Sequence, residues 1–140
     1  MTAGTGWDEP TPALDEPDDV ADQTPQLYYR SLPEFVREFF VPMFPRDVKH
    51  SPGQTWCPKW WEHPEAIYRL ESLWRSWEHL RLDPALGSST WLRDHLDHHL
   101  PRLLDASGPF KGCSFDGHTV RDYTLPIEEP DEGLYADENA

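Results

Sequence analysis

The chain has 140 residues and a formal net charge of −14 at neutral pH, but its excess of acids is confined to the two ends. Residues 1–29 and 122–140 each contain seven Asp or Glu and no Lys or Arg, whereas the segment from Arg30 to Arg121 carries twelve acids and twelve bases. A neutral middle segment argues against a folded surface that imitates DNA, and it offers no basic stripe for binding a phosphate backbone.

The acidic ends are rich in Pro, Asp, Glu and Thr, a composition that buries too little apolar area to offset chain entropy. We therefore expect a disordered leader over residues 1–26, a single α-helical domain over residues 27–125 and a disordered tail over residues 126–140. The ends would keep the protein soluble. The alternative is that a basic partner docks on one of them. We expect no membrane span and no signal peptide, and two widely spaced cysteines favour the reducing cytoplasm.

The first helix is predicted from its start signals. Ser31 is a suitable N-cap, Pro33 suits a first turn, and Glu34 stands three residues after Ser31 and completes a capping box. Pro42 is expected to weaken the last turn and Pro45 to end the helix.

A short aromatic stretch, Trp56-Cys57-Pro58-Lys59-Trp60-Trp61, comes after a connector. Three tryptophans in six residues favour an aromatic cluster packed against helix ends, because indoles bury a large apolar area. The alternative is an exposed interaction surface formed by Trp56, Trp60 and Trp61. Tryptophans that bind single-stranded nucleic acid normally lie in a basic groove, and this segment lacks one.

The clearest helical pattern runs from about Pro64 to Arg81 and should form the centre of the fold. Apolar residues recur there at spacings of three and four and cover one wide face. The face consists of Ala66, Ile67, Leu70, Leu73, Trp74, Trp77 and Leu80.

A third helix is predicted from Thr90 to about Leu100, capped by Ser88 or Ser89 and limited by Pro101, with Arg102-Leu103-Leu104-Asp105 as a possible further turn. Trp91 belongs to its apolar face, so the predicted core includes Leu70, Trp74, Trp77 and Trp91. Beyond it, Asp116-Gly117 gives a weak hairpin signal. The fold class is thus a small three-helix domain, mainly α, with a C-terminal arm that is extended or forms a short β-hairpin.

One metal site suggests itself on the third helix. His95 and His99 are four residues apart on one helical face and within reach of a single ion. Cys57 and Cys113 would complete a Cys₂His₂ set, a ligand set that zinc favours in closed structural sites. Neither cysteine belongs to a CxxC pair, however, and isolated cysteines are more often small buried hydrophobes, so a packed, metal-free arrangement stays open.

A catalytic site is not expected. Cys57 or Cys113 with His95 could pair as nucleophile and base. No phosphate loop, paired-carboxylate signature or HExxH motif accompanies them, and no oxyanion element is visible. We therefore expect a protein that is not an enzyme.

Three stretches of the sequence are long and unusual: WCPKWWEHPEAIYRLESLWRSWEHLRLDPALG, WLRDHLDHH and LLDASGPFKGC. They resemble an uncharacterised family of actinobacterial proteins catalogued as domain of unknown function 4913, over about Tyr29 to Leu125. Members of that family are often encoded on plasmids, integrative conjugative elements and phages. The matching positions are Cys57, His63, Trp74, Trp77, Glu78, Leu80, Asp83, Pro84, Trp91, Arg93, Asp94, His95, Asp97, His99 and Cys113.

The resemblance implies a domain that exists as a unit in a mobile genetic element, and it brings no established activity. We expect an accessory protein that binds a protein partner in the cytoplasm. A small zinc-binding protein with a structural Cys₂His₂ site is the alternative. A nucleic-acid-associated regulator is a further alternative that the charge distribution disfavours.

Overall fold

The structure, a computed structural model, describes residues 26–140, so the predicted leader lies outside it except for its last residue. Among the described residues the chain forms three helices and no strand, which confirms the mainly α fold. The first helix comprises α1 (Leu32–Phe35), η2 (Val36–Phe40) and α2 (Val41–Met43). The second is α3 (Pro64–Leu80), preceded by the short turn η3 (Trp60–Glu62). The third comprises α4 (Gly87–Trp91), η4 (Leu92–Leu96) and α5 (Asp97–Leu104).

Within residues 26–140, no helix combines the length and the apolar character needed to cross a lipid bilayer.

The first helix begins where its sequence predicts. The Glu34 amide donates to Ser31 Oγ at 3.4 Å, and Glu34 Oε2 accepts from the Arg30 amide at 3.2 Å. The helix ends at Met43, ahead of Pro45, but a wide π turn, η2, interrupts it just before Pro42. Such turns insert an extra residue and rotate the rest of the helix, and spacing rules do not detect them.

The third helix begins earlier than predicted and includes the further turn after Pro101 that the sequence allows. It begins at Gly87, so neither predicted serine caps it, and in the turn before it Asp83 Oδ1 accepts from the amides of Ala85 and Leu86. A side chain at Gly87 would place its Cβ only 1.8 Å from the Leu80 carbonyl oxygen, so this tight turn requires glycine. The helix also continues through Pro101, which lies on the exposed face, to Leu104. A carbonyl left unpaired there by the missing proline N–H can be solvated by water.

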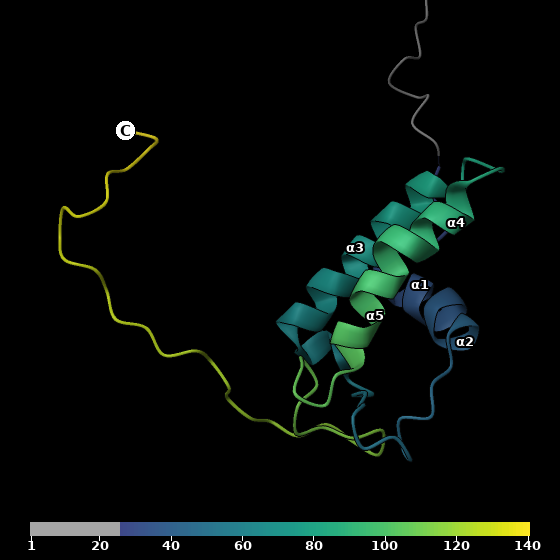
Figure 1. The fold of residues 1–140 in the computed structure, drawn as a ribbon, viewed down its shortest axis with the longest axis horizontal. Helices are drawn as coiled ribbons and strands as arrows, with labels where there is room; N and C mark the ends of the chain where they lie inside the picture. The colour runs from purple at the N-terminus through teal and green to yellow at the C-terminus, as the bar shows by residue number, and fades with distance from the viewer. Residues whose placement is uncertain (1–25) are drawn as a thin grey trace, which may run out of the picture.

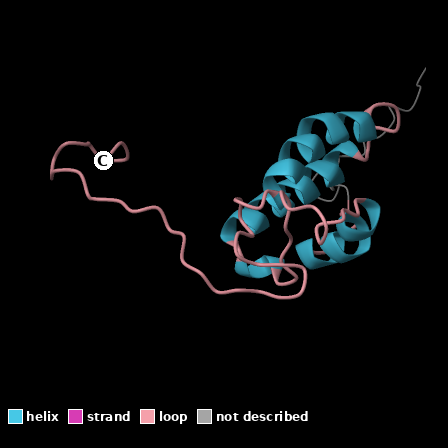
Figure 2. Cartoon of the chain, turned by 60° about the horizontal axis from the view of Figure 1, so that its bottom comes forward, coloured by secondary structure: helices cyan, strands magenta, loops and turns pink. Residues whose placement is uncertain are grey.

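Helix α3 lies at the centre of the fold. It packs against α4 and α5 along one side and against α1 on another, as Figure 1 and Figure 2 show. Leu70, Trp74 and Trp91 are buried as predicted, whereas Trp77 is only partly buried. Trp77 contacts an aromatic cluster formed by Tyr28, Tyr29, Phe35 and Phe39.

The core contains one buried carboxylate, Glu78, which is 5% exposed. Its oxygens accept from the Tyr28 and Tyr29 amides at 2.8 and 2.9 Å. They also accept from Trp74 Nε1 at 3.2 Å and from Arg81 Nε at 3.0 Å. Glu78 therefore fastens the segment before α1 to α3. Its four donors satisfy a charge that would otherwise be costly to bury.

Replacing Glu78 should destabilise the domain strongly. We expect Glu78→Ala to lower the free energy of unfolding by about 3 kcal/mol, because it leaves the Tyr29 amide, the Trp74 indole and Arg81 Nε without their acceptor. The matched control is Glu71→Ala, which removes a surface ion pair with Arg75 and should cost less than about 0.5 kcal/mol. Urea unfolding followed by tryptophan fluorescence measures both values. Equal losses in the two variants would contradict this role of Glu78.

Candidate metal centre

Two loops that are distant in sequence meet beside the start of α3 and bring four potential metal ligands together. These are Cys57, His63, Cys113 and His118, whose ligand atoms all lie within 4.8 Å of one another. Cys57 Sγ lies 3.2 Å from His118 Nδ1. Cys113 Sγ lies 3.6 Å from both His63 Nε2 and His118 Nδ1.

These separations fit a tetrahedral metal site. Zinc lies about 2.3 Å from a thiolate sulfur and about 2.0–2.1 Å from an imidazole nitrogen, which puts a sulfur and a nitrogen about 3.6 Å apart along a tetrahedron edge. Two of the three sulfur–nitrogen distances have this value, and the third is shorter by a few tenths of an ångström. One nitrogen from each ring lies near a sulfur, and all four ligand atoms lie within 4.8 Å of one another, so one ion could contact all four after a small adjustment.

The first loop is positioned by hydrogen bonds to the end of α5. The Thr55 amide donates to the Leu104 carbonyl at 2.8 Å, and the Ala106 amide donates to the Gly53 carbonyl at 3.1 Å. Cys57 comes directly after this contact and is completely buried. His63 is the residue that precedes Pro64 at the start of α3, with extended backbone angles, as expected before a proline.

The second loop is shaped by two turns. Gly112 has a φ of 89° and precedes Cys113, which is 7% exposed. Ser114 and Gly117 then exchange two backbone hydrogen bonds, at 3.2 and 3.0 Å, in a tight turn that brings His118 back to the cysteine. The predicted hairpin is thus a single isolated bridge, and the arm beyond it is extended.

Hydrogen bonds also surround the sulfurs. The Thr119 amide donates to Cys113 Sγ at 3.4 Å, which supports negative charge on that sulfur. The Thr55 hydroxyl donates to the Cys113 carbonyl at 2.8 Å and joins the two loops directly. Outer contacts of this kind orient metal ligands.

Burial dominates the electrostatics of the cluster. It raises the pKa of the Cys57 thiol to about 11, with neighbouring Cys113 acting in the same direction. It lowers the pKa of His63, as does His118, whereas the backbone of Pro109 raises it. Without a cation, the Cys57 thiol is therefore protonated and His63 neutral at neutral pH. A bound divalent cation would displace the thiol proton and favour the thiolate.

The structure does not bring the two histidines of the predicted ligand set, His95 and His99, to the cysteines. They lie on the third helix, in η4 and α5, and neither is among the ligand atoms that converge at the cysteines. His99 Nδ1 is 3.0 Å from Arg69 Nη1. Burial first and then the Arg69 charge lower the pKa of His99, and that guanidinium would also repel a metal cation. The candidate ligand set is therefore corrected to Cys57, His63, Cys113 and His118.

The two histidine ligands that the spacing argument missed have a simple sequence signal. Each cysteine is followed by a histidine a few residues later, His63 after Cys57 and His118 after Cys113. Such local pairs put two ligands in one loop, so only two segments need to meet. His63 also matches the family pattern, whereas His118 has only its distance from Cys113 as a signal.

The three tryptophans before α3 do not behave alike. Trp56 and Trp60 are partly buried against the core, and Trp56 contacts Phe110 at a ring-centroid distance of 5.0 Å. Trp61 is 52% exposed. The predicted packed cluster thus describes two of these side chains, whereas the third is open to solvent.

Comparison with protein families places this chain in the family described as "Domain of unknown function (DUF4913)", whose model matches residues 29–131. The chain belongs to that family, as its three unusual stretches suggest. No curated protein and no solved structure matches it.

A glycine substitution tests how the second loop holds Cys113. Gly112→Ala should lower the free energy of unfolding by about 1–2 kcal/mol, because an L residue is strained at this positive φ. Its Cβ would also lie 3.0 Å from Arg121 Cδ. The control is Gly117→Ala in the same loop, where φ is not positive and no atom lies within 4 Å of the added Cβ. Chemical denaturation should show a clear loss for the first variant and little change for the second. The opposite order would contradict the described loop.

Proposed function

We propose that this domain is a zinc-stabilised interaction module in which one Zn²⁺ joins the loop before α3 to the arm after α5. The observation that carries the proposal is the convergence of two thiols and two imidazoles within 4.8 Å. Soft thiolates combined with imidazoles in a tetrahedron favour zinc over the hard cations Mg²⁺ and Ca²⁺. No other ligand type is needed to complete the coordination.

The ligand count points to a structural rather than a catalytic role. Four protein side chains fill the tetrahedron, whereas catalytic zinc keeps one position open for water or substrate. Cys57 and Cys113 are both buried, which suits a closed site.

We further propose that the module is a non-enzymatic accessory protein of an actinobacterial plasmid, conjugative element or phage. Membership of the family supports this context. Exposed aromatic and aliphatic side chains beside the metal centre, Trp61 among them, support a role in protein binding. Affinity purification of the full chain from an actinobacterial host should recover a reproducible protein partner. Recovery of no protein above background under mild washing would count against this role.

Metal analysis with four histidine variants tests the zinc site directly. Protein purified without a histidine tag should contain about one equivalent of zinc, as expected for a single closed site. His63→Ala and His118→Ala should each lose most of it, because three ligands hold zinc less tightly than four. The matched controls His95→Ala and His99→Ala should keep the full equivalent, since these rings lie away from the sulfurs. Elemental analysis after gel filtration gives the stoichiometry.

Two results would contradict the proposed site. One is a zinc content below about a tenth of an equivalent, with a melting temperature that a chelator does not change, since structural zinc contributes to folding outright. The other is loss of zinc from the His95 or His99 variant but not from the His63 and His118 variants. Substitution by Co²⁺ gives an independent check, because tetrahedral thiolate coordination has a distinctive visible spectrum.

A further inference from the structure

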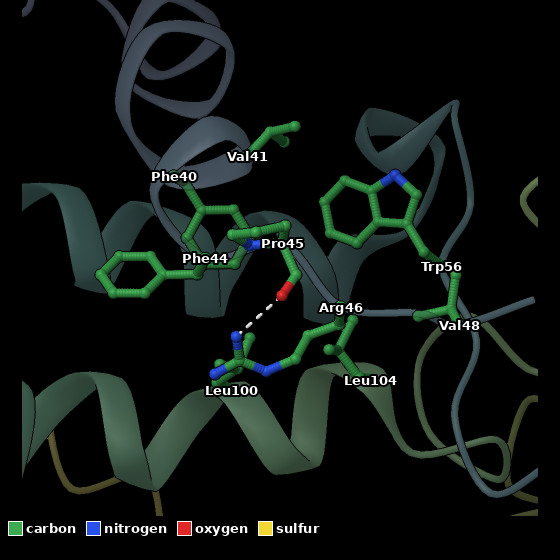
Figure 3. A pocket seen from close by; sticks show the side chains of 9 residues that line it. All are labelled: Phe40, Val41, Phe44, Pro45, Arg46, Val48, Trp56, Leu100 and Leu104. Atoms are coloured by element: carbon green, nitrogen blue, oxygen red, sulfur yellow. Dashed lines mark hydrogen bonds between the residues drawn. The ribbon is translucent and has the colours of Figure 1, made fainter. Parts of the chain in front are cut away.

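A long apolar groove runs along the face of the molecule next to the metal centre. It consists of two adjoining hollows, of about 250 and 410 Å³, which share Val41 and Trp56. Figure 3 shows side chains from α2, from the loop around Trp56 and from α5 converging on the first hollow. The second hollow continues past Trp60 and Trp61. We call this surface the Trp56 groove.

The charged side chains that line the Trp56 groove are Arg37 and Arg46, and no carboxylate of residues 26–140 lines either hollow. Arg37 pairs with Glu38 at 3.0 Å, so the uncompensated positive charge of the groove is that of Arg46. Arg46 donates to the Pro45 carbonyl at 2.9 Å, and Figure 3 shows its guanidinium beside Leu100. Within residues 26–140 no carboxylate forms an ion pair with Arg46. An occupant of this groove should therefore combine apolar side chains with acids.

The C-terminal arm of this same chain has that composition. Residues 125–132 read LPIEEPDE, and Leu125 and Ile127 are 81% and 82% exposed. Four acids come after them within five positions, with no base. Pro126 and Pro130 favour an extended, polyproline-like backbone, the conformation that grooves lined by aromatic residues bind.

The arm is attached to its own domain only at its base. The Lys111 ammonium lies 5.1 Å from the centroid of the Tyr123 ring, and the Tyr123 hydroxyl approaches Gly112. From residue 124 onward, the described hydrogen bonds are all between near neighbours in sequence. Figure 1 and Figure 2 both show this part of the arm running away from the helices. Its apolar side chains are therefore presented to another molecule rather than to their own core.

We infer that the groove is a docking site for residues 125–132 of a second copy, so that two chains exchange their arms. Leu125 and Ile127 would enter the hollows beside Trp56, and the acids after them would face Arg46. The exchange is reciprocal and closes with two-fold symmetry, so each dimer contains two identical contacts. This inference goes beyond the proposed zinc site, which fixes only the base of the arm.

The test is the solution mass of the full chain, measured by sedimentation velocity over a range of concentrations with zinc content determined for every sample. The wild type should reach the mass of two chains. Both Leu125→Ser/Ile127→Ser in the arm and Val41→Asp in the groove should halve that mass. The matched controls are Leu134→Ser/Tyr135→Ser, farther along the arm, and Leu92→Asp, an exposed helical leucine away from the groove. Both controls should stay dimeric.

Mixing the arm variant with the groove variant distinguishes a dimer formed by arm exchange from any other kind of dimer. The groove variant still has an intact arm, and the arm variant still has an intact groove, so the mixture should form a heterodimer with one contact. A monomeric wild type that retains zinc would overturn the exchange while leaving the metal site standing. A dimer that persists in both variants would also overturn the exchange. The same holds for a monomer whose arm binds its own groove and is there protected from hydrogen exchange. Melting curves confirm that each variant is folded.

Discussion

The meeting of two loops at a pair of buried thiols is the constraint that positions the chain outside the three helices. The loop around Cys57 lies between the first helix and α3, and the loop around Cys113 comes after the third helix. Neither contains a helix longer than one turn, so few backbone hydrogen bonds hold them. The contacts of Thr55 with Leu104 and Cys113 bring them together. A metal ion that binds all four ligands would turn this contact into a permanent link.

The helices are stabilised differently, by aromatic packing around one buried charge. Glu78 accepts hydrogen bonds from the backbone amides of Tyr28 and Tyr29, from the Trp74 indole and from Arg81. Trp91 joins the third helix to α3, because its Nε1 donates to the Leu73 carbonyl at 3.1 Å. Buried networks of this kind favour one packing over others only when every donor has an acceptor. In the described residues no buried side-chain nitrogen or oxygen lacks a partner, so the helical part has its own determinants, separate from those of the loops.

Sequence reasoning succeeds here where the physics is local. The capping box at Ser31, the proline at the start of α3 and the apolar spacing along it all act within a few residues, and the helix starts they predict agree with the structure. The third helix fails this test in an instructive way. It begins at Gly87, ahead of the expected serines, and its His95 and His99 are not among the ligand atoms that converge at the cysteines. Both cysteines can be identified from the sequence because thiols are rare in this chain. Their histidine partners cannot be identified from helical periodicity, because they come together only when two loops meet in the folded structure.

The metal centre and the Trp56 groove share one short segment. Trp56 lines the groove, and the next residue, Cys57, belongs to the metal centre. Phe110 connects them, since its ring contacts both Trp56 and His63 at centroid distances of 5.0 Å. The side chain that divides the groove into two hollows is thus held in place by the loop that carries a ligand. Movement of this loop would displace the groove wall as well as the sulfur, because closely packed side chains transmit such shifts. A structural metal in this position would have a consequence beyond stability, since it would also fix the shape of the Trp56 groove.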